Sequence, residues 1–111
     1  MEMTLNAYQG AAIKTSNRDY GIPPIAYFAL GLSGEAGEAA EKVKKLFRDD
    51  KGVISGDRRD AIVGELGDAL WYLSAVAYEL GVDLDDVARK NLEKIESRTR
   101  RGVRGGEGDN R

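Results

Sequence analysis

Apolar residues recur at intervals of three and four along most of this 111-residue chain, and this spacing constrains the fold more than any other feature. Side chains with that period line one face of an α-helix. The clearest run begins at Pro23 and Pro24, which suit the first turn of a helix, and continues to about Phe47. Its apolar members are Ile25, Ala29, Leu32, Ala36, Ala39, Val43 and Leu46. The best strand candidate is only the short segment 52–54, so we predict an all-α fold.

Three more helices are predicted from the same spacing, at about residues 4–18, 57–80 and 84–101. The residues expected to cap or end them are Thr4, Asp57, Gly81 and Asp83. The helix over 57–80 carries a second long stripe, formed by Ile62, Leu66, Ala69, Leu73, Val76 and Leu80. Four such helices leave too much apolar surface for a small monomer, so we predict self-association. We expect one domain over residues 1–101, followed by a basic, glycine-rich tail at 102–111.

The residue types that are missing exclude several kinds of catalytic site. The chain has no cysteine and no histidine. It therefore lacks thiolate nucleophiles, sulfur-bound zinc, the Ser-His-Asp triad and the Glu-x-x-His sites of di-iron bundles. Catalysis must then use carboxylates, lysine, arginine, tyrosine or serine, and Mg²⁺ or Mn²⁺ is the metal that suits oxygen ligands.

Charge is unevenly placed along the chain. The last fourteen residues hold five arginines against Glu107 and Asp109, whereas the chain as a whole has a net charge of −2. An acidic body with a short basic tail is unlike a duplex-binding protein, which has a broad basic face. The tail is either a solvated terminus or a segment that closes over bound phosphates. No apolar run approaches a membrane span and the N-terminus does not resemble a secretory signal, so we expect a cytoplasmic protein that binds no membrane.

Three glycines interrupt the helix predicted from Pro23 in the segment GLSGEAGEAAEK, at Gly31, Gly34 and Gly37. Each glycine inside a helix costs about 1 kcal/mol relative to alanine. We interpret them as positions where a neighbouring helix, a metal ion or a phosphate approaches the backbone closely.

Two pairs of carboxylates have the same three-residue spacing on neighbouring helices. Glu35 and Glu38 form the first pair, and Glu65 and Asp68 form the second. Residues three apart project from one face of a helix, so an antiparallel helix pair can direct all four toward each other. Close carboxylates repel strongly unless a cation lies between them, which favours a magnesium site. The alternative is an ordinary solvated face, with Glu38 paired to Lys42 and Glu41 to Lys45.

The combination of GLSGEAGEAAEKVKK, ELGDALWYL and NLEKIESRTRRG resembles the MazG-like branch of the all-α nucleotide pyrophosphohydrolases. The signature of that family is E-x-x-E followed by E-x-x-D on the next long helix. The resemblance implies a four- to five-helix bundle that is completed by oligomerisation, as a homodimer or homotetramer. It also implies a Mg²⁺-dependent enzyme, with Mn²⁺ as a possible substitute, that cleaves nucleoside triphosphates between the α and β phosphates.

Carried over residue by residue, the resemblance makes Glu35, Glu38, Glu65 and Asp68 the metal ligands. Many relatives have a further glutamate at the position of Gly34. Either Glu38 acts as the general base, or the attacking water is activated directly by the metal.

Other side chains are candidates for binding the rest of the nucleotide. Asn91, Lys94 and Arg98 share one face of the last helix and suit phosphate oxygens. Trp71, three residues after Asp68, is either a core residue or a surface for the base. Lys44, Lys45 and the tail arginines are further phosphate candidates. The identity of the base remains open, including the phosphoribosyl-ATP used by a related branch, and so do a nucleotide sensor without turnover and a structural oligomer.

Overall fold

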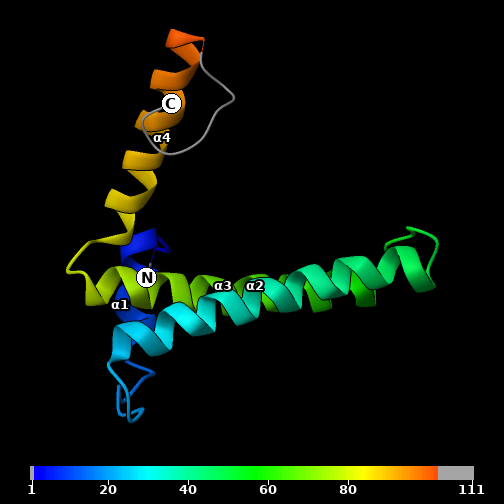
Figure 1. The fold of residues 1–111 in the computed structure, drawn as a ribbon, viewed down its shortest axis with the longest axis horizontal. Helices are drawn as coiled ribbons and strands as arrows, with labels where there is room; N and C mark the ends of the chain where they lie inside the picture. The colour runs from blue at the N-terminus through cyan, green and yellow to red at the C-terminus, as the bar shows by residue number, and fades with distance from the viewer. Residues whose placement is uncertain (1, 103–111) are drawn as a thin grey trace.

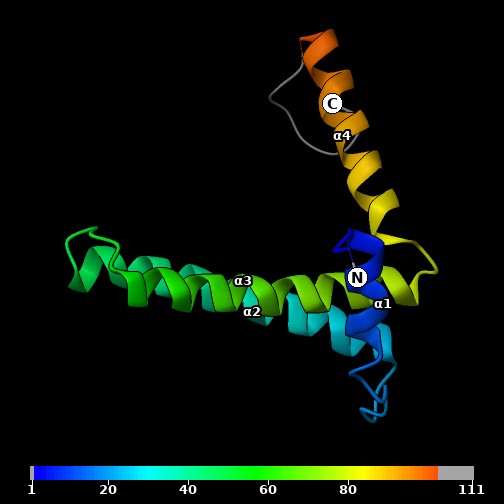
Figure 2. The ribbon, with the colours of Figure 1, turned by 180° about the vertical axis from the view of Figure 1, so that it is seen from behind.

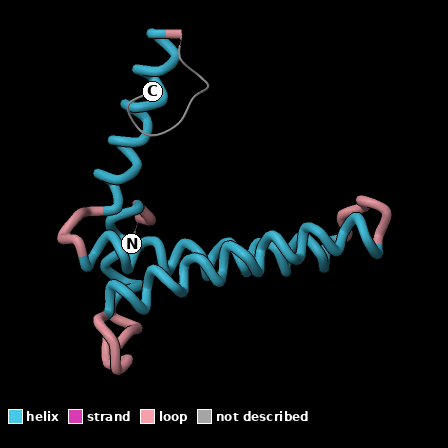
Figure 3. The backbone as a smooth tube through the Cα atoms, viewed as in Figure 1, coloured by secondary structure: helices cyan, strands magenta, loops and turns pink. Residues whose placement is uncertain are grey.

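The structure, a computed structural model, describes residues 2–102. Within this range the chain forms helices connected by loops and turns and contains no strand (Figure 3). The helices are α1 (Leu5–Ile13), α2 (Pro24–Asp49), α3 (Gly56–Glu79) and α4 (Leu84–Arg101). The predicted all-α fold is confirmed. The residues of the basic tail from 103 onward lie outside the described range.

The two long helices α2 and α3 run antiparallel and lie side by side along their lengths (Figures 1 and 2). α1 packs against α3 at the end where α2 begins. α4 starts beside α1 and rises away from the α2–α3 pair, contacting α1 and α3 but not α2. No described helix has both the length and the apolar composition needed to cross a bilayer.

α1 is shorter than predicted, since it ends at Ile13 instead of residue 18. The backbone N–H groups of Thr15 and Ser16 donate to the carbonyls of Ala12 and Ile13, which closes the helix with tight turns. Arg18 then has a positive φ of 60°, a conformation that no helix continues through. These local hydrogen bonds end the helix early, and they cannot be predicted from the spacing of apolar residues.

The cap of α3 is Ser55 and not the predicted Asp57. The Ser55 hydroxyl accepts a hydrogen bond from the backbone N–H of Arg58 at 3.2 Å, whereas Asp57 lies in the first turn. Both residue types favour a helix N-terminus, because a carboxylate in the first turn also stabilises the helix dipole. The prediction that Thr4 caps α1 is confirmed by a 3.0 Å bond to its hydroxyl from Ala7 N–H.

The N-terminus of α4 is satisfied by a side chain from α1. Asp83 precedes the helix as predicted, but its side chain makes no capping hydrogen bond. Instead, the buried Gln9 side chain accepts from the N–H of Leu84 at 3.0 Å and donates to the carbonyls of Ser74 and Val82. One amide thus connects α1, the end of α3 and the start of α4.

The core is small, and an aromatic cluster surrounds Phe28. Phe28 is fully buried, and the rings of Tyr20 and Trp71 each lie 5.6 Å from it in edge-to-face geometry. Much of the predicted apolar stripes stays exposed: Leu66 and Leu80 are 56% and 63% accessible. The reason is geometric, because each helix of a two-helix layer covers only one side of the other.

Gly31 allows the Tyr72 ring of α3 to lie directly against the backbone of α2. A Cβ atom built on Gly31 would lie 2.2 Å from a ring carbon of Tyr72, whereas at Gly34 and Gly37 it would meet nothing within 4 Å. The interpretation that a neighbouring helix approaches is therefore confirmed for Gly31 within the described chain.

Replacing Gly31 by alanine should destabilise the protein by about 1–3 kcal/mol, because the Tyr72 ring must move out of a packed position. Gly34→Ala is the matched control, and it should leave stability unchanged or raise it by up to about 1 kcal/mol. Urea unfolding of both variants measures the difference. Shifts of equal sign and size would contradict the packing role of Gly31.

Candidate functional site

Three carboxylates from the two long helices meet near the middle of the α2–α3 pair. Glu35 on α2 faces Glu65 and Asp68 on α3, and one oxygen from each lies within 4.8 Å of the other two. Glu35 and Glu65 are half-buried and Asp68 is exposed. Glu65 and Asp68 are three residues apart and therefore share the face of α3 that borders α2.

The fourth predicted ligand, Glu38, lies one turn further along α2 and is exposed. It does not belong to the group of close oxygens. Its negative charge nevertheless contributes to raising the pKa of Glu35, which places it near the cluster. The structure thus brings three of the four predicted carboxylates together and leaves Glu38 at their edge.

The cluster is electrostatically strained. A hydrogen bond with Glu65 is the main cause that raises the pKa of Glu35, followed by burial and by the negative charges of Asp68, Glu65 and Glu38. The ammonium group of Lys42 also lies near the cluster, with its Nζ 3.7 Å from a Glu65 oxygen. Converging oxygen donors with excess negative charge suit a hard divalent cation such as Mg²⁺ or Mn²⁺.

We expect stability without divalent cations to fall as pH rises through the pKa of Glu35. The folded-state pKa is raised above the ordinary value of 4.5, so protonated Glu35 stabilises the fold below 4.5, and this contribution is lost as the pH passes the raised value. Glu35→Gln should remove this loss. Melting temperatures of both proteins in chelator, measured across acidic and neutral pH, test this, and parallel curves would contradict it.

A cleft of about 380 Å³ opens beside the carboxylates and is lined by Glu35, Asp68, Trp71 and Tyr72. This volume lies within the range of small-ligand pockets. The Trp71 indole N–H donates to the Thr15 hydroxyl at 2.9 Å, so this donor is already used within the chain. The acidic oxygens and the aromatic rings nevertheless border one cavity, as expected for a site that receives a charged group and a flat one.

Two tyrosines near the cluster were not among the predicted site residues. Burial is the main cause that raises the pKa of Tyr72, followed by a hydrogen bond with Tyr27, while the charge of Glu35 contributes less. Burial and the charge of Asp68 raise the pKa of Tyr8. The position of Tyr72, four residues after Asp68, was a usable signal. The sequence contained no comparable signal for Tyr8, because Tyr8 lies near the cluster only through the packing of α1.

The predicted phosphate-binding residues lie on α4, apart from the cluster. Asn91 borders a second cavity of about 390 Å³ between α1, α3 and α4, and its other lining residues are Leu5, Leu70, Leu73, Leu84, Val87 and Ala88. Lys94 and Arg98 follow further along α4, which makes no contact with α2. Within one chain, this face is therefore not brought beside the carboxylates of α2.

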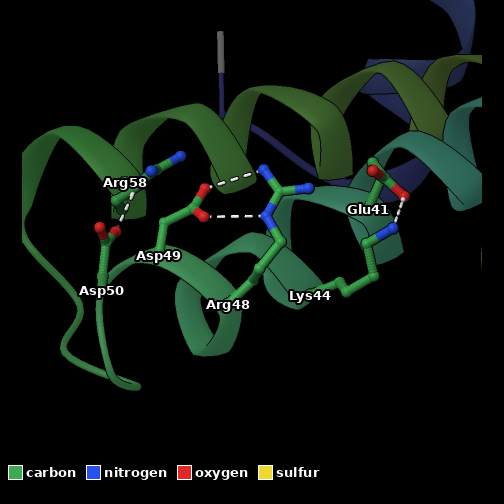
Figure 4. Close-up of polar contacts among 6 residues, drawn as sticks. All are labelled: Glu41, Lys44, Arg48, Asp49, Asp50 and Arg58. Carbon is green, nitrogen blue, oxygen red and sulfur yellow. Dashed lines mark hydrogen bonds and ion pairs between the residues drawn. The ribbon is translucent and has the colours of Figure 1, made fainter.

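Other charges on α2 form ion pairs near the turn into α3 (Figure 4). Glu41 pairs with Lys44 at 3.0 Å, and Asp50 pairs with Arg58 at 2.7 Å. The sequence spacing predicted pairs of Glu38 with Lys42 and of Glu41 with Lys45. The structure instead pairs Lys42 with Glu65 and Lys44 with Glu41. Exposed pairs of this kind contribute little to stability, so this end of the helix pair is an ordinary solvated surface.

The chain matches known proteins in two kinds of comparison. The model of the MazG nucleotide pyrophosphohydrolase domain matches residues 26–103, which include the cluster and all of α4. The chain is also 50% identical over 90 residues to the Gene 37 protein of Mycobacterium phage L5, covering 81% of this chain and 79% of the phage protein. No solved structure matches the chain.

Proposed function

The chain belongs to the MazG nucleotide pyrophosphohydrolase family, and we propose that it hydrolyses a nucleoside triphosphate between the α and β phosphates. The products are a nucleoside monophosphate and pyrophosphate. The observation that carries the proposal is the convergence of Glu35, Glu65 and Asp68 within 4.8 Å at an open cleft. Family membership supports the class of reaction, and the cluster supplies the donor atoms that this reaction needs.

The three clustered carboxylates are proposed to hold Mg²⁺, with Mn²⁺ as an alternative. A bound divalent cation neutralises phosphate charge and lowers the pKa of a coordinated water. The hydrogen bond with Glu65, burial and the negative charges around it raise the pKa of Glu35. A divalent cation between the three carboxylates would relieve their repulsion.

Glu38 is proposed as the general base. It is exposed, lies one turn from Glu35 on α2, and is not needed to complete the group of close oxygens. A carboxylate in this position can accept the proton of the attacking water without leaving a ligand position. The alternative is that the metal activates the water without a protein base, which fits the presence of Gly34 where many relatives have a glutamate.

The aromatic wall of the cleft is proposed to receive the nucleoside. The rings of Trp71 and Tyr72 lie 5.0 Å apart in edge-to-face geometry, so they cannot both stack flat on one base. One ring is expected to face the base while the other closes the side of the cleft. Asn91, Lys94 and Arg98 are the proposed ligands of the phosphate chain.

Binding of Mg²⁺ should stabilise the protein. A divalent cation at 100 times its dissociation constant adds about 2.7 kcal/mol to the free energy of unfolding. We expect the melting temperature to rise with Mg²⁺ in the wild type and to respond much less in Glu35→Gln. A structural oligomer without a metal site predicts equal responses in the two proteins.

A panel of ordinary and modified nucleoside triphosphates, assayed with Mg²⁺ and with Mn²⁺, tests the proposed activity. Release of pyrophosphate from at least one member supports it. The peripheral position of Glu38 makes a nucleotide sensor the second candidate, since such a protein keeps the metal site but lacks an effective base. The sensor predicts saturable nucleotide binding with no pyrophosphate released from any member of the panel.

A further inference from the structure

Trp71 lines the cleft of the proposed site and is held in place by contacts on other sides of its ring. Its indole N–H donates to the Thr15 hydroxyl at 2.9 Å. The rings of Phe28 and Tyr72 lie 5.6 Å and 5.0 Å from the indole, both in edge-to-face geometry. A tryptophan ring can otherwise adopt two broad χ2 orientations. The position of the acceptor for the N–H selects one of them, so the ring borders the cleft in a single orientation.

The Thr15 hydroxyl is oriented to accept this hydrogen bond. It donates its own hydrogen to the carbonyl of Ala12 at 2.7 Å, and the Thr15 N–H donates to the same carbonyl at 3.0 Å. Because its one hydrogen points at α1, the hydroxyl presents lone pairs to the indole N–H. Serine could make both hydroxyl bonds, whereas valine keeps the shape of threonine and makes neither. The hydrogen bond to Trp71 therefore requires a hydroxyl at position 15.

The segment that carries Thr15 is attached to α3 at a second point. Arg18, which turns the chain with a φ of 60°, pairs with Glu79 at 2.6 Å. Its guanidinium also lies 5.8 Å from the centre of the Tyr78 ring. The Glu79 side chain is only 9% exposed. Two contacts from positions three residues apart therefore fix the backbone around Thr15 relative to α3, and the hydroxyl is in place before any ligand binds.

The neighbouring ring of the cleft, Tyr72, is held by different residues. It packs against the backbone of Gly31, where an added Cβ atom would lie 2.2 Å from the Tyr72 ring. It also makes a hydrogen bond with Tyr27. Contacts with α2 thus fix Tyr72, whereas the orientation of Trp71 depends in part on an exposed hydrogen bond to Thr15. A substitution at position 15 should therefore alter one wall of the cleft and leave the other in place.

We propose that Thr15 is a positioning residue for the nucleoside, because its hydroxyl fixes the Trp71 ring as a preformed wall of the cleft. The inference rests on the proposed function for the identity of the ligand, whereas the hydrogen bond is present without one. A wall that is fixed before binding lowers the free-energy cost of ordering the site around the base. Thr15 thus acts on nucleoside binding through Trp71, and we expect it to have no effect on the binding of the phosphates.

Fluorescence tests the fixed indole without any ligand, because Trp71 is the only tryptophan of the chain. Thr15→Val should expose the indole N–H to water and loosen the ring, so the emission should shift to the red and the steady-state anisotropy should fall. Thr15→Ser should keep both values of the wild type. The matched control is Thr99→Val, the same substitution at an exposed position on α4. Emission and anisotropy of Thr15→Val equal to those of the wild type would overturn the proposal.

A double-mutant cycle, measured by titration calorimetry with Mg²⁺ present, tests the link to the nucleoside. The probes are the α,β-methylene analogues of ATP and CTP, which resist cleavage at the proposed bond, and inorganic pyrophosphate, which has no base. Thr15→Val should weaken binding of at least one analogue by about 3–10-fold, the range expected for one hydrogen bond. It should change pyrophosphate binding by less than about twofold. In a Trp71→Phe background, which keeps a flat ring without the N–H, Thr15→Val should have no further effect.

Unchanged affinity of Thr15→Val for both analogues would overturn the proposal, and so would the absence of saturable analogue binding to the wild type. An equal loss in the Trp71→Phe background, or an equal loss for pyrophosphate, would also overturn it, since Thr15 would then act through α1 and not through Trp71. Weakened analogue binding without pyrophosphate release from any triphosphate of the panel would instead reject the proposed hydrolysis and keep the role of Thr15. Circular dichroism of every variant checks that the helices are intact.

Discussion

Replacing Asp68 by asparagine is expected to lower kcat/KM for pyrophosphate release by about 10²–10³-fold, the loss typical of removing one preorganised electrostatic contact from an active site. Asparagine keeps the size of the side chain but removes one of the three charges that lie within 4.8 Å of each other. Steady-state kinetics with saturating Mg²⁺ measure the effect. Stability in chelator should not fall, because the substitution reduces repulsion in the cluster.

The matched control is Asp60→Asn, two turns earlier on α3, where the aspartate is exposed. It removes the same charge from the same helix and should change kcat/KM by less than about threefold, because exposed charges at this distance are screened by solvent. An Asp68→Asn enzyme as active as Asp60→Asn would show that the cluster has no part in the reaction. Glu38→Gln, assayed beside them, should lower kcat more than KM if Glu38 takes the proton.

Replacing Phe28 by alanine is expected to destabilise the protein by about 3–5 kcal/mol. Phe28 is fully buried and lies at the centre of the aromatic cluster that connects α2, α3 and the segment before α2. Its removal leaves a cavity beside the rings of Tyr20, Tyr27 and Trp71, each of which loses its edge-to-face contact with Phe28. Equilibrium urea unfolding at fixed protein concentration measures the change.

Phe47→Ala is the control for this effect, since Phe47 lies on the same helix but is 70% exposed. Its loss should cost less than about 1 kcal/mol, because little apolar surface around it is removed from water. If the two substitutions destabilised the protein equally, the core of the monomer would not be centred on Phe28.

Local sequence patterns predicted most of the helices because their causes are local. The apolar spacing and the residues that favour helix ends lie within a few positions of the structure they determine, as with Thr4 at the start of α1 and Gly81, whose φ is +71°, after α3. Errors occurred where two local signals competed. Ser55 and Asp57 both favour a helix start, and only the hydrogen bond to Arg58 distinguishes them.

The candidate site was predictable only in part because its geometry depends on how α2 meets α3. The three-residue spacing placed Glu35 and Glu38 on one face, but it could not determine which of them points at Glu65. That choice depends on the register of the helix pair, which the contact of Gly31 with the Tyr72 ring helps to fix. The sequence contained the glycine, but the side chain that packs against it lies 41 positions away.

The direction of α4 could not be predicted from local sequence patterns either. It depends on the Gln9 amide, which holds the end of α3 and the first N–H of α4 from a position 75 residues before Leu84. The spacing of Asn91, Lys94 and Arg98 predicts that they share one face of α4. It gave no information on whether that face meets the carboxylates of its own chain or those of a second copy.

The most direct test of the proposed hydrolysis is the identity of its phosphorus products. A nucleoside triphosphate from the panel, incubated with the wild-type protein and Mg²⁺, can be followed by phosphorus NMR alongside the Asp68→Asn variant. We predict equal amounts of nucleoside monophosphate and pyrophosphate with the wild type, and unchanged triphosphate with the variant over the same period. Formation of nucleoside diphosphate and orthophosphate, or turnover at equal rates by both proteins, would contradict the assignment of the reaction to this cluster.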